Sequence, residues 1–199
     1  VKRGSDFIKL MASGGFASGT GRAQQMTLAE MQASVEAAHM RGVRITTHAY
    51  ATHAISDAVL AGVDSVEHGI GLDEVAVPTM MVFDPPARTK GTALVNTALI
   101  ERMREESLQM SRRAVGLAIQ HKVPLAFGSD ATQAVVGKSA YEFTLLVRAG
   151  LTPMQAIATA TTGAAAHLRI ADRAGSIAPG KRADLIAVSR NPLDDVAAL

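Results

Sequence analysis

One pattern occurs twice in the middle of the chain: a helical stretch ends at a glycine, and a short apolar stretch then ends at a histidine. The glycine and histidine are Gly42 and His48 in the first copy, and Gly62 and His68 in the second. A third helical stretch, over 101–122, also leads into an apolar stretch. Helices that alternate with strands through short links are typical of parallel βα units. The chain is therefore predicted to be an α/β protein with a parallel sheet.

The composition limits the class of protein. The chain has 199 residues, of which 48% are hydrophobic and 19% charged, so it is long enough to bury a core and is typical of a globular protein. It has no cysteine, so metal ligands would have to be nitrogen or oxygen atoms, which suits zinc or manganese. A net charge of +2 without a basic cluster argues against a nucleic-acid partner. No apolar run is long enough for a membrane span. The compartment is left open, with the cytoplasm as the default expectation.

Local signals set the boundaries of several elements. Thr27 and Glu30 form the pattern of a capping box at the start of a helix. Further helices are predicted over 141–148 and 153–168, the second with Thr152 as N-cap and Pro153 in its first turn. Additional strands are predicted in three places, over 75–83, 125–130 and 182–188.

A polar residue lies at or near the carboxyl end of four predicted strands. These residues are Lys9, His48, His68 and Asp130. A buried charge or imidazole is costly unless it is paired or bound to a cation. Functional groups of a parallel α/β barrel gather at the carboxyl ends of its strands. The shared position of the four residues therefore predicts one cation site.

Each of these residues also has a simpler explanation, which is the more frequent one for an isolated residue of its type. Lys9 could extend from a strand edge to water, His68 could cap a turn, and Asp130 could cap a helix. Tyr50, two residues after His48, could simply pack in the core. Only the joint pattern favours a metal site.

Four short runs occur in a fixed order: FIKL at 7–10, THAY at 47–50, GVDSVEHG at 62–69 and GSDA at 128–131. They resemble the fourth, fifth, sixth and eighth barrel strands of the amidohydrolase superfamily, in particular its imidazolonepropionase-like and prolidase-like branch. The tail over 175–186 is similar to the segment that leaves that barrel for a small β-sandwich. The resemblance implies a partial (β/α)8 TIM-type barrel, strands four to eight, over 1–174. The start of a C-terminal β-sandwich segment would follow over 175–199.

The resemblance also implies a role for each candidate residue. Lys9 would carry a carbamate, derived from carbon dioxide, that bridges two divalent ions, with zinc as the expected metal. His48 and His68 would bind the second ion. Asp130 would bind the first ion and act as general base on the bridging water. Tyr50 would contact the substrate. The implied reaction is hydrolysis of a carbon–nitrogen bond in a small cyclic amide or dipeptide-like substrate by a metal-activated hydroxide.

Two features depart from the family pattern. In such barrels a His-x-His pair completes the ligands of the first metal ion, and no such pair occurs in the chain. Strands one to three also have no counterpart before Lys9. A complete barrel has about 250 residues, so we expect truncation at the amino end and little activity of this chain alone. The link over 69–74 is shorter than the dozen or so residues that a parallel crossover needs. The origin of both departures is left open.

Two other classes of function stay open. One is a non-catalytic remnant that binds metal or ligand without turnover. The other is a phosphate or nucleotide binder that uses the glycine-rich stretch 13–21, which follows a strand and precedes a helix. That stretch lacks both Gly-x-Gly-x-x-Gly and Gly-Lys-Ser/Thr, so a loop at the mouth of the site is the better interpretation. Formation of a homo-oligomer is left open.

Overall fold

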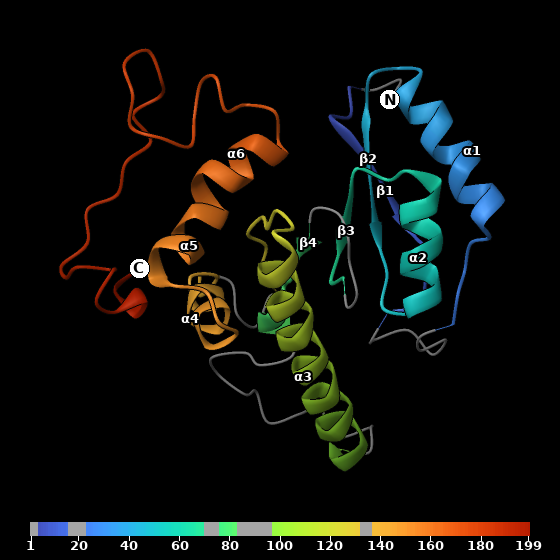
Figure 1. The fold of residues 1–199 in the computed structure, drawn as a ribbon, viewed down its shortest axis with the longest axis horizontal. Helices are drawn as coiled ribbons and strands as arrows, with labels where there is room; N and C mark the ends of the chain where they lie inside the picture. Colours follow the sequence, from blue (N-terminus) through green and yellow to red (C-terminus); the bar gives the residue numbers. More distant parts are fainter. Residues whose placement is uncertain (1–3, 16–22, 70–75, 83–96, 132–136) are drawn as a thin grey trace.

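The computed structural model of the chain describes residues 4–15, 23–69, 76–82, 97–131 and 137–199. Within these ranges, four strands form one parallel sheet in the order β1-β2-β3-β4, which confirms the predicted α/β class (Figure 1). The strands are β1 (Phe7–Met11), β2 (Arg44–His48), β3 (Ser65–Glu67) and β4 (Ala76–Val77). Strands that follow one another in the chain are therefore neighbours in the sheet, as consecutive βα units require.

Helices α1 (Leu28–His39) and α2 (Thr52–Ala61) connect the first three strands and cover one face of the sheet (Figure 1). Helix α1 begins where predicted, because the Glu30 amide donates to the Thr27 hydroxyl and the Thr27 amide donates to the Glu30 carboxylate. Gly62 ends α2 with a φ of 84°, a left-handed conformation that glycine adopts without steric cost. Both helix boundaries thus follow from local sequence.

The remaining helices lie in the second half of the chain. The helix predicted over 101–122 is α3 (Thr97–His121), and the one predicted over 141–148 is α4 (Tyr141–Arg148). The helix predicted over 153–168 is interrupted by a π-helical turn. Its parts are α5 (Pro153–Ala158), the turn η3 (Thr159–Gly163) and α6 (Ala164–His167). Short 3-10 turns are η1 (Met80–Val82) and η4 (Val196–Ala198). None of the described helices is long and apolar enough to cross a membrane.

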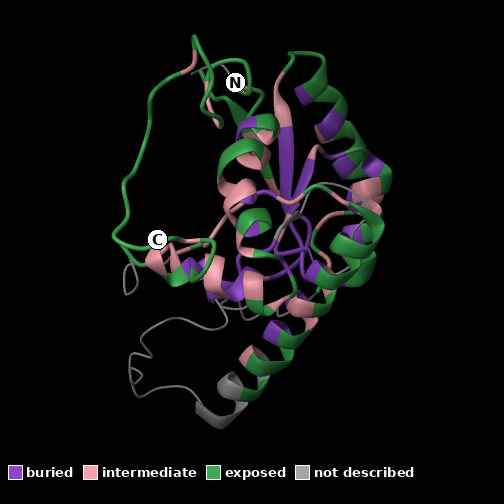
Figure 2. Cartoon of the chain, turned by 60° about the vertical axis from the view of Figure 1, so that its left-hand side comes forward, coloured by how far each residue is buried: buried purple, intermediate pink, exposed green. Residues whose placement is uncertain are grey.

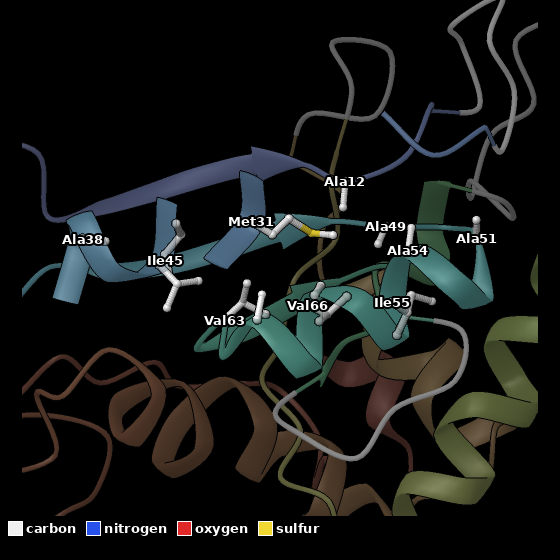
Figure 3. Packing of buried hydrophobic residues seen from close by; sticks show 13 residues of the cluster. Ala12, Met31, Ala38, Ile45, Ala49, Ala51, Ala54, Ile55, Val63 and Val66 are labelled. Carbon is white, nitrogen blue, oxygen red and sulfur yellow. The ribbon is translucent and has the colours of Figure 1, made fainter. Parts of the chain in front are cut away.

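The main core lies between the sheet and helices α1 and α2 (Figure 3). Met31 of α1 and Ile55 of α2 pack toward Ile45 of β2 and Val66 of β3, and all four side chains are buried. Because side chains alternate along a strand, these inward residues direct their sequence neighbours to the opposite face. The polar residues of that opposite face form the candidate site.

The strand predicted over 75–83 is wrong in its extent. Only β4 pairs with β3, and the chain then turns into η1, while Val75 and Phe83 lie outside the described residues. Pro78 has no amide hydrogen to give to a ladder, and Thr79 has a φ of 47°, which no strand residue adopts.

The strands predicted over 125–130 and 182–188 do not form in the described chain. Among the described residues neither segment joins the ladder of the sheet; Leu125 is assigned to an isolated bridge, and the Phe127 amide donates to the Thr159 carbonyl at 3.0 Å. Most of the second segment is exposed and follows the outside of the molecule (Figure 2). A strand requires a partner strand at its edge, and an apolar run alone does not supply one. Assignment of 175–199 to a flanking β-sandwich stays a prediction.

The backbone of the π-helical turn η3 lies against the 125–130 segment. A methyl group at Gly163 would lie 2.7 Å from the Leu125 carbonyl oxygen and 3.1 Å from that of Ala158. Both are backbone atoms, so neither can move aside as a side chain would. Gly163 therefore permits the close approach that supports the segment leading to Asp130.

We predict that Gly163→Ala destabilises the fold by about 1–3 kcal/mol, because the added methyl group overpacks this contact. Gly116→Ala is the matched control: Gly116 lies within α3, and a methyl group there meets no atom within 4 Å. Alanine favours a helix interior over glycine by roughly 1 kcal/mol, so this variant should be as stable as the wild type or more stable. Urea unfolding measures the free energy of unfolding of both variants, and equal stability of the two would refute the close contact.

Candidate active site

Strand alternation places one set of polar side chains on the sheet face that points away from α1 and α2. In the parallel register Lys9 lies beside Thr46, and His48 lies beside Glu67. Paired residues of a parallel sheet project to the same face, as do residues two apart on one strand. Lys9 and His48 therefore share a face of the sheet.

Lys9 forms an ion pair with Glu67, a residue that the sequence analysis did not select. The Lys9 side chain is 41% exposed and that of Glu67 is 22% exposed, so solvent weakens this pair. The Glu67 carboxylate also lies 3.5 Å from the Thr46 hydroxyl. The available signal was strand alternation, because Glu67 follows the inward-facing Val66 and pairs with His48, so it projects to the Lys9 face.

Three rings form a buried cluster at the carboxyl end of β2 and β3. The ring centroids of His48 and His68 are 4.6 Å apart, and the rings meet edge to face. Tyr50 stacks on His68 with a centroid separation of 4.8 Å and meets His48 edge to face at the same separation. The structure thus brings together three of the five predicted site residues. Tyr50 packs in this cluster, and its predicted contact with substrate remains a prediction.

His48 has a ring nitrogen that no described group satisfies. Its Nε2 atom is buried and, within the described ranges, has no hydrogen-bond partner. Gly15 lies against this nitrogen, since a methyl group on Gly15 would be 3.4 Å from it. A buried polar atom without a partner is costly and calls for an explanation, such as a ligand that the chain binds.

Burial keeps both histidines uncharged at neutral pH. The pKa of His68 falls to about 3, because burial penalises the charged ring and the charges of His48 and Lys9 add repulsion. The pKa of His48 is also lowered, first by burial and then by Lys9, while hydrogen bonding and nearby carboxylates oppose the shift. Neutral imidazoles offer a nitrogen lone pair, which is the state that metal binding requires.

One nitrogen of the His68 ring already has a hydrogen-bond partner. His68 Nδ1 lies 2.6 Å from the Thr79 hydroxyl, and both side chains are buried. A histidine that binds a metal through one nitrogen usually has such a partner on the other nitrogen, which orients the ring. Thr79 was not predicted as a site residue, because the sequence analysis assigned its segment, 75–83, to a strand without a functional residue.

Asp130 is exposed and is the last residue of the 125–130 segment, which is not a regular strand. Its charge opposes the lowering of the His48 pKa, so it lies within electrostatic reach of that ring. In the part of the chain that the structure describes, no three His, Asp or Glu side chains gather closely enough to hold a metal ion. The four predicted ligands thus appear as a histidine pair, with Lys9 paired to Glu67 and Asp130 nearby.

The glycine-rich stretch begins beside this cluster. Ser13 is buried, bridges to Gln24, and accepts a hydrogen bond from the Tyr50 amide at 2.8 Å. Residues 16–22 lie outside the described residues, so the proposed phosphate-binding role of the stretch stays untested. The described part of the stretch instead supports the backbone beside Tyr50.

Comparison with known proteins decides the family. The family model described as "Amidohydrolase family" matches residues 1–199. The chain belongs to the amidohydrolase family. The resemblance in sequence is thereby confirmed.

Individual relatives within the amidohydrolases agree with this assignment. Ochratoxinase of Aspergillus niger is 31% identical over 98% of the chain. The crystal structure of a Xaa-Pro dipeptidase with bound methionine in the active site has a TM-score of 0.87 and 33% identity over 99% of the chain. A prolidase complexed with N-methylphosphonate-L-proline has a TM-score of 0.88 and 30% identity. The chain spans 43% of ochratoxinase and 52% of the dipeptidase, about half the length of these relatives.

The lowered pKa of His68 predicts how stability depends on pH. The unfolded chain binds a proton on His68 below about pH 6.5, whereas the folded chain does so only near pH 3. His68 therefore lowers the free energy of unfolding as pH falls from 6.5 towards 3, by at most about 1.4 kcal/mol per pH unit. His68→Gln should flatten this slope in urea unfolding measured with a chelator present. His53→Gln, at an exposed position of α2, is the control; identical slopes for His68→Gln and wild type would contradict the prediction.

Proposed function

We propose that this amidohydrolase chain contributes the histidine side of a metal centre that hydrolyses carbon–nitrogen bonds in small amide or dipeptide-like substrates. The observation that carries the proposal is the pair of buried, uncharged imidazoles of His48 and His68, 4.6 Å apart. Relatives named for prolidase, dipeptidase and ochratoxinase activity support the substrate class. The activity of the whole protein is part of this proposal.

The residues present fit a divalent ion on the side of the two histidines. His48 Nε2 is buried with no partner among the described groups, and the Thr79 contact at Nδ1 leaves the Nε2 nitrogen of His68 for a ligand. Nitrogen ligands without any thiolate suit zinc or a similar ion. When bound, such an ion lowers the pKa of water and polarises the scissile carbonyl.

Lys9 would join this centre as a carbamate. As an ammonium group it pairs with Glu67 and repels a cation. Loss of a proton from the ammonium group, followed by addition of the amine to carbon dioxide with release of a second proton, would give a carbamate whose two oxygens share one negative charge and could serve two metal ions. The carbamate and Glu67 would then both be anionic, so carboxylation would also break the ion pair. Glu67 therefore favours the unmodified form of Lys9.

Asp130 is proposed as the general base. Its exposed carboxylate lies within electrostatic reach of His48, and its backbone has a φ of 45°. A carboxylate beside the attacking water can accept its proton and then deliver it to the leaving nitrogen. Tyr50, packed against both histidine rings, would contact the substrate.

The barrel assignment is also part of the proposal. Strands β1, β2 and β3 would correspond to strands four, five and six, and β4 to strand seven. The 125–130 segment would take the place of strand eight, although it joins no ladder among the described residues. The sequential parallel order of the sheet supports this numbering.

Metal titration tests the histidine pair. Wild-type protein should bind Zn²⁺ in isothermal titration calorimetry, and His48→Asn should weaken binding about tenfold or more, which corresponds to about 1.4 kcal/mol. His53→Asn replaces an exposed histidine of α2 and should bind as the wild type does. Unchanged affinity in His48→Asn would refute the ligand role.

Hydrolysis of Xaa-Pro dipeptides and N-acyl amides by the Zn²⁺-loaded whole protein, in which the activity is expected, tests the reaction. Asp130→Asn should lower kcat by roughly 10²–10⁴-fold, because it removes the proton acceptor, and Lys9→Ala should also abolish turnover. Asp172→Asn and Lys138→Ala, at exposed positions, are the matched controls. Wild-type turnover in Lys9→Ala would refute the bridging role. Zn²⁺ binding without cleavage of any substrate would overturn the hydrolase proposal and favour a non-catalytic metal-binding protein.

A further inference from the structure

A buried carboxylate lies outside the face that carries the candidate site. Glu142 belongs to the first turn of α4 and has no exposed surface. Its two oxygens accept hydrogen bonds from the amides of Met80 and Met81, at 2.7 and 2.6 Å. A buried carboxylate is tolerated only when it is well bonded, and bonds to a charged acceptor are stronger than neutral ones. Glu142 therefore attaches α4 firmly to η1.

Thr79, the residue before Met80 and Met81, contacts the ring of His68. The Thr79 hydroxyl lies 2.6 Å from His68 Nδ1, and the side chain of Thr79 is 4% exposed. Thr79 has a φ of 47°, an unfavourable conformation for a β-branched residue. Such a conformation persists only where neighbouring contacts hold it. The two hydrogen bonds that the amides of Met80 and Met81 donate to Glu142 are contacts of this kind.

We propose that Glu142 is a positioning residue for His68, acting through Thr79. By holding the backbone at Met80 and Met81, the Glu142 carboxylate keeps the Thr79 hydroxyl against His68 Nδ1. The hydroxyl accepts the proton of Nδ1, which leaves the lone pair of Nε2 available as a ligand. The tautomer of His68 is thus set by a carboxylate that never touches the ring. Only the metal-binding part of the test below rests on the proposed function.

The charge state of Glu142 sets the conditions of the test. Burial raises its pKa to about 7, while the amides of Met80 and Met81 oppose that shift. At pH 8 the carboxylate is largely ionised, so both oxygens can accept. Glu142→Gln keeps the shape of the side chain but replaces one acceptor oxygen by a donor, which cannot pair with an amide hydrogen.

The decisive measurement is the pair of ring ¹⁵N chemical shifts of His68, recorded on metal-free protein at pH 8. Wild-type protein should show two well-separated shifts, the signature of one tautomer with the proton on Nδ1. In Glu142→Gln the two shifts should move toward each other, as they do when both tautomers are populated. Thr79→Val should show the same change, and Thr79→Ser, which keeps the hydroxyl, should restore the wild-type pattern.

Two matched variants separate positioning from damage to the fold. Leu146→Ala removes a fully buried side chain of the same helix without changing a polar group. Glu106→Gln makes the same chemical change at an exposed position of α3. Both should leave the His68 shifts unchanged. If Glu142→Gln does not fold, Glu142→Asp, which keeps the charge but shortens the reach, is measured in its place.

The outcomes decide the proposal independently of the metal centre. Unchanged His68 shifts in Glu142→Gln, or an equal change in Leu146→Ala, would overturn the positioning role. Zn²⁺ titration should show binding about tenfold weaker in Glu142→Gln than in wild type, as is usual when a partner of a metal ligand is lost. If wild-type protein binds no Zn²⁺, the proposed function fails, and the His68 shifts still decide the role of Glu142.

Discussion

The parallel register of β1, β2 and β3 is the constraint on which the rest of the structure depends. It assigns Ile45 and Val66 to the helix-covered core and, by alternation, directs Lys9, His48 and Glu67 to the other face. A slip of one residue would exchange the two faces and expose the apolar set to water. Formation of the core and assembly of the candidate site are therefore the same event in this chain.

Burial then determines the chemistry of that face. His48 and His68 lie where water cannot stabilise a positive charge, so both stay neutral and their nitrogens remain available. Lys9 and Glu67 are nearer to solvent and form an ion pair. The face thus combines uncharged imidazole nitrogens with an ion pair that lies nearer to solvent.

The parts of the fold that could be predicted from the sequence are those fixed by local interactions. The capping box of Thr27 and Glu30 and the glycine that ends α2 each involve residues a few positions apart. The strands predicted over 125–130 and 182–188 failed because a strand depends on a remote partner, which an apolar run does not reveal. The same limit applies to the site. The shared position at strand ends predicted that His48 and His68 lie together, as they do. The hydrogen bond from the Met80 amide to Glu142 joins residues 62 positions apart and leaves no local pattern.

Three residues around the site, His68, Thr79 and Asp130, have a positive φ without being glycine. At each position a glycine would relax the backbone. It would also remove the imidazole of His68, the hydroxyl of Thr79 that orients that imidazole, or the carboxylate of Asp130 that is proposed to act as general base. Thermostability and the arrangement of polar groups therefore pull in opposite directions at these positions. An engineer who selected variants of this chain only for resistance to heat would tend to erase the features that give this face its chemical character.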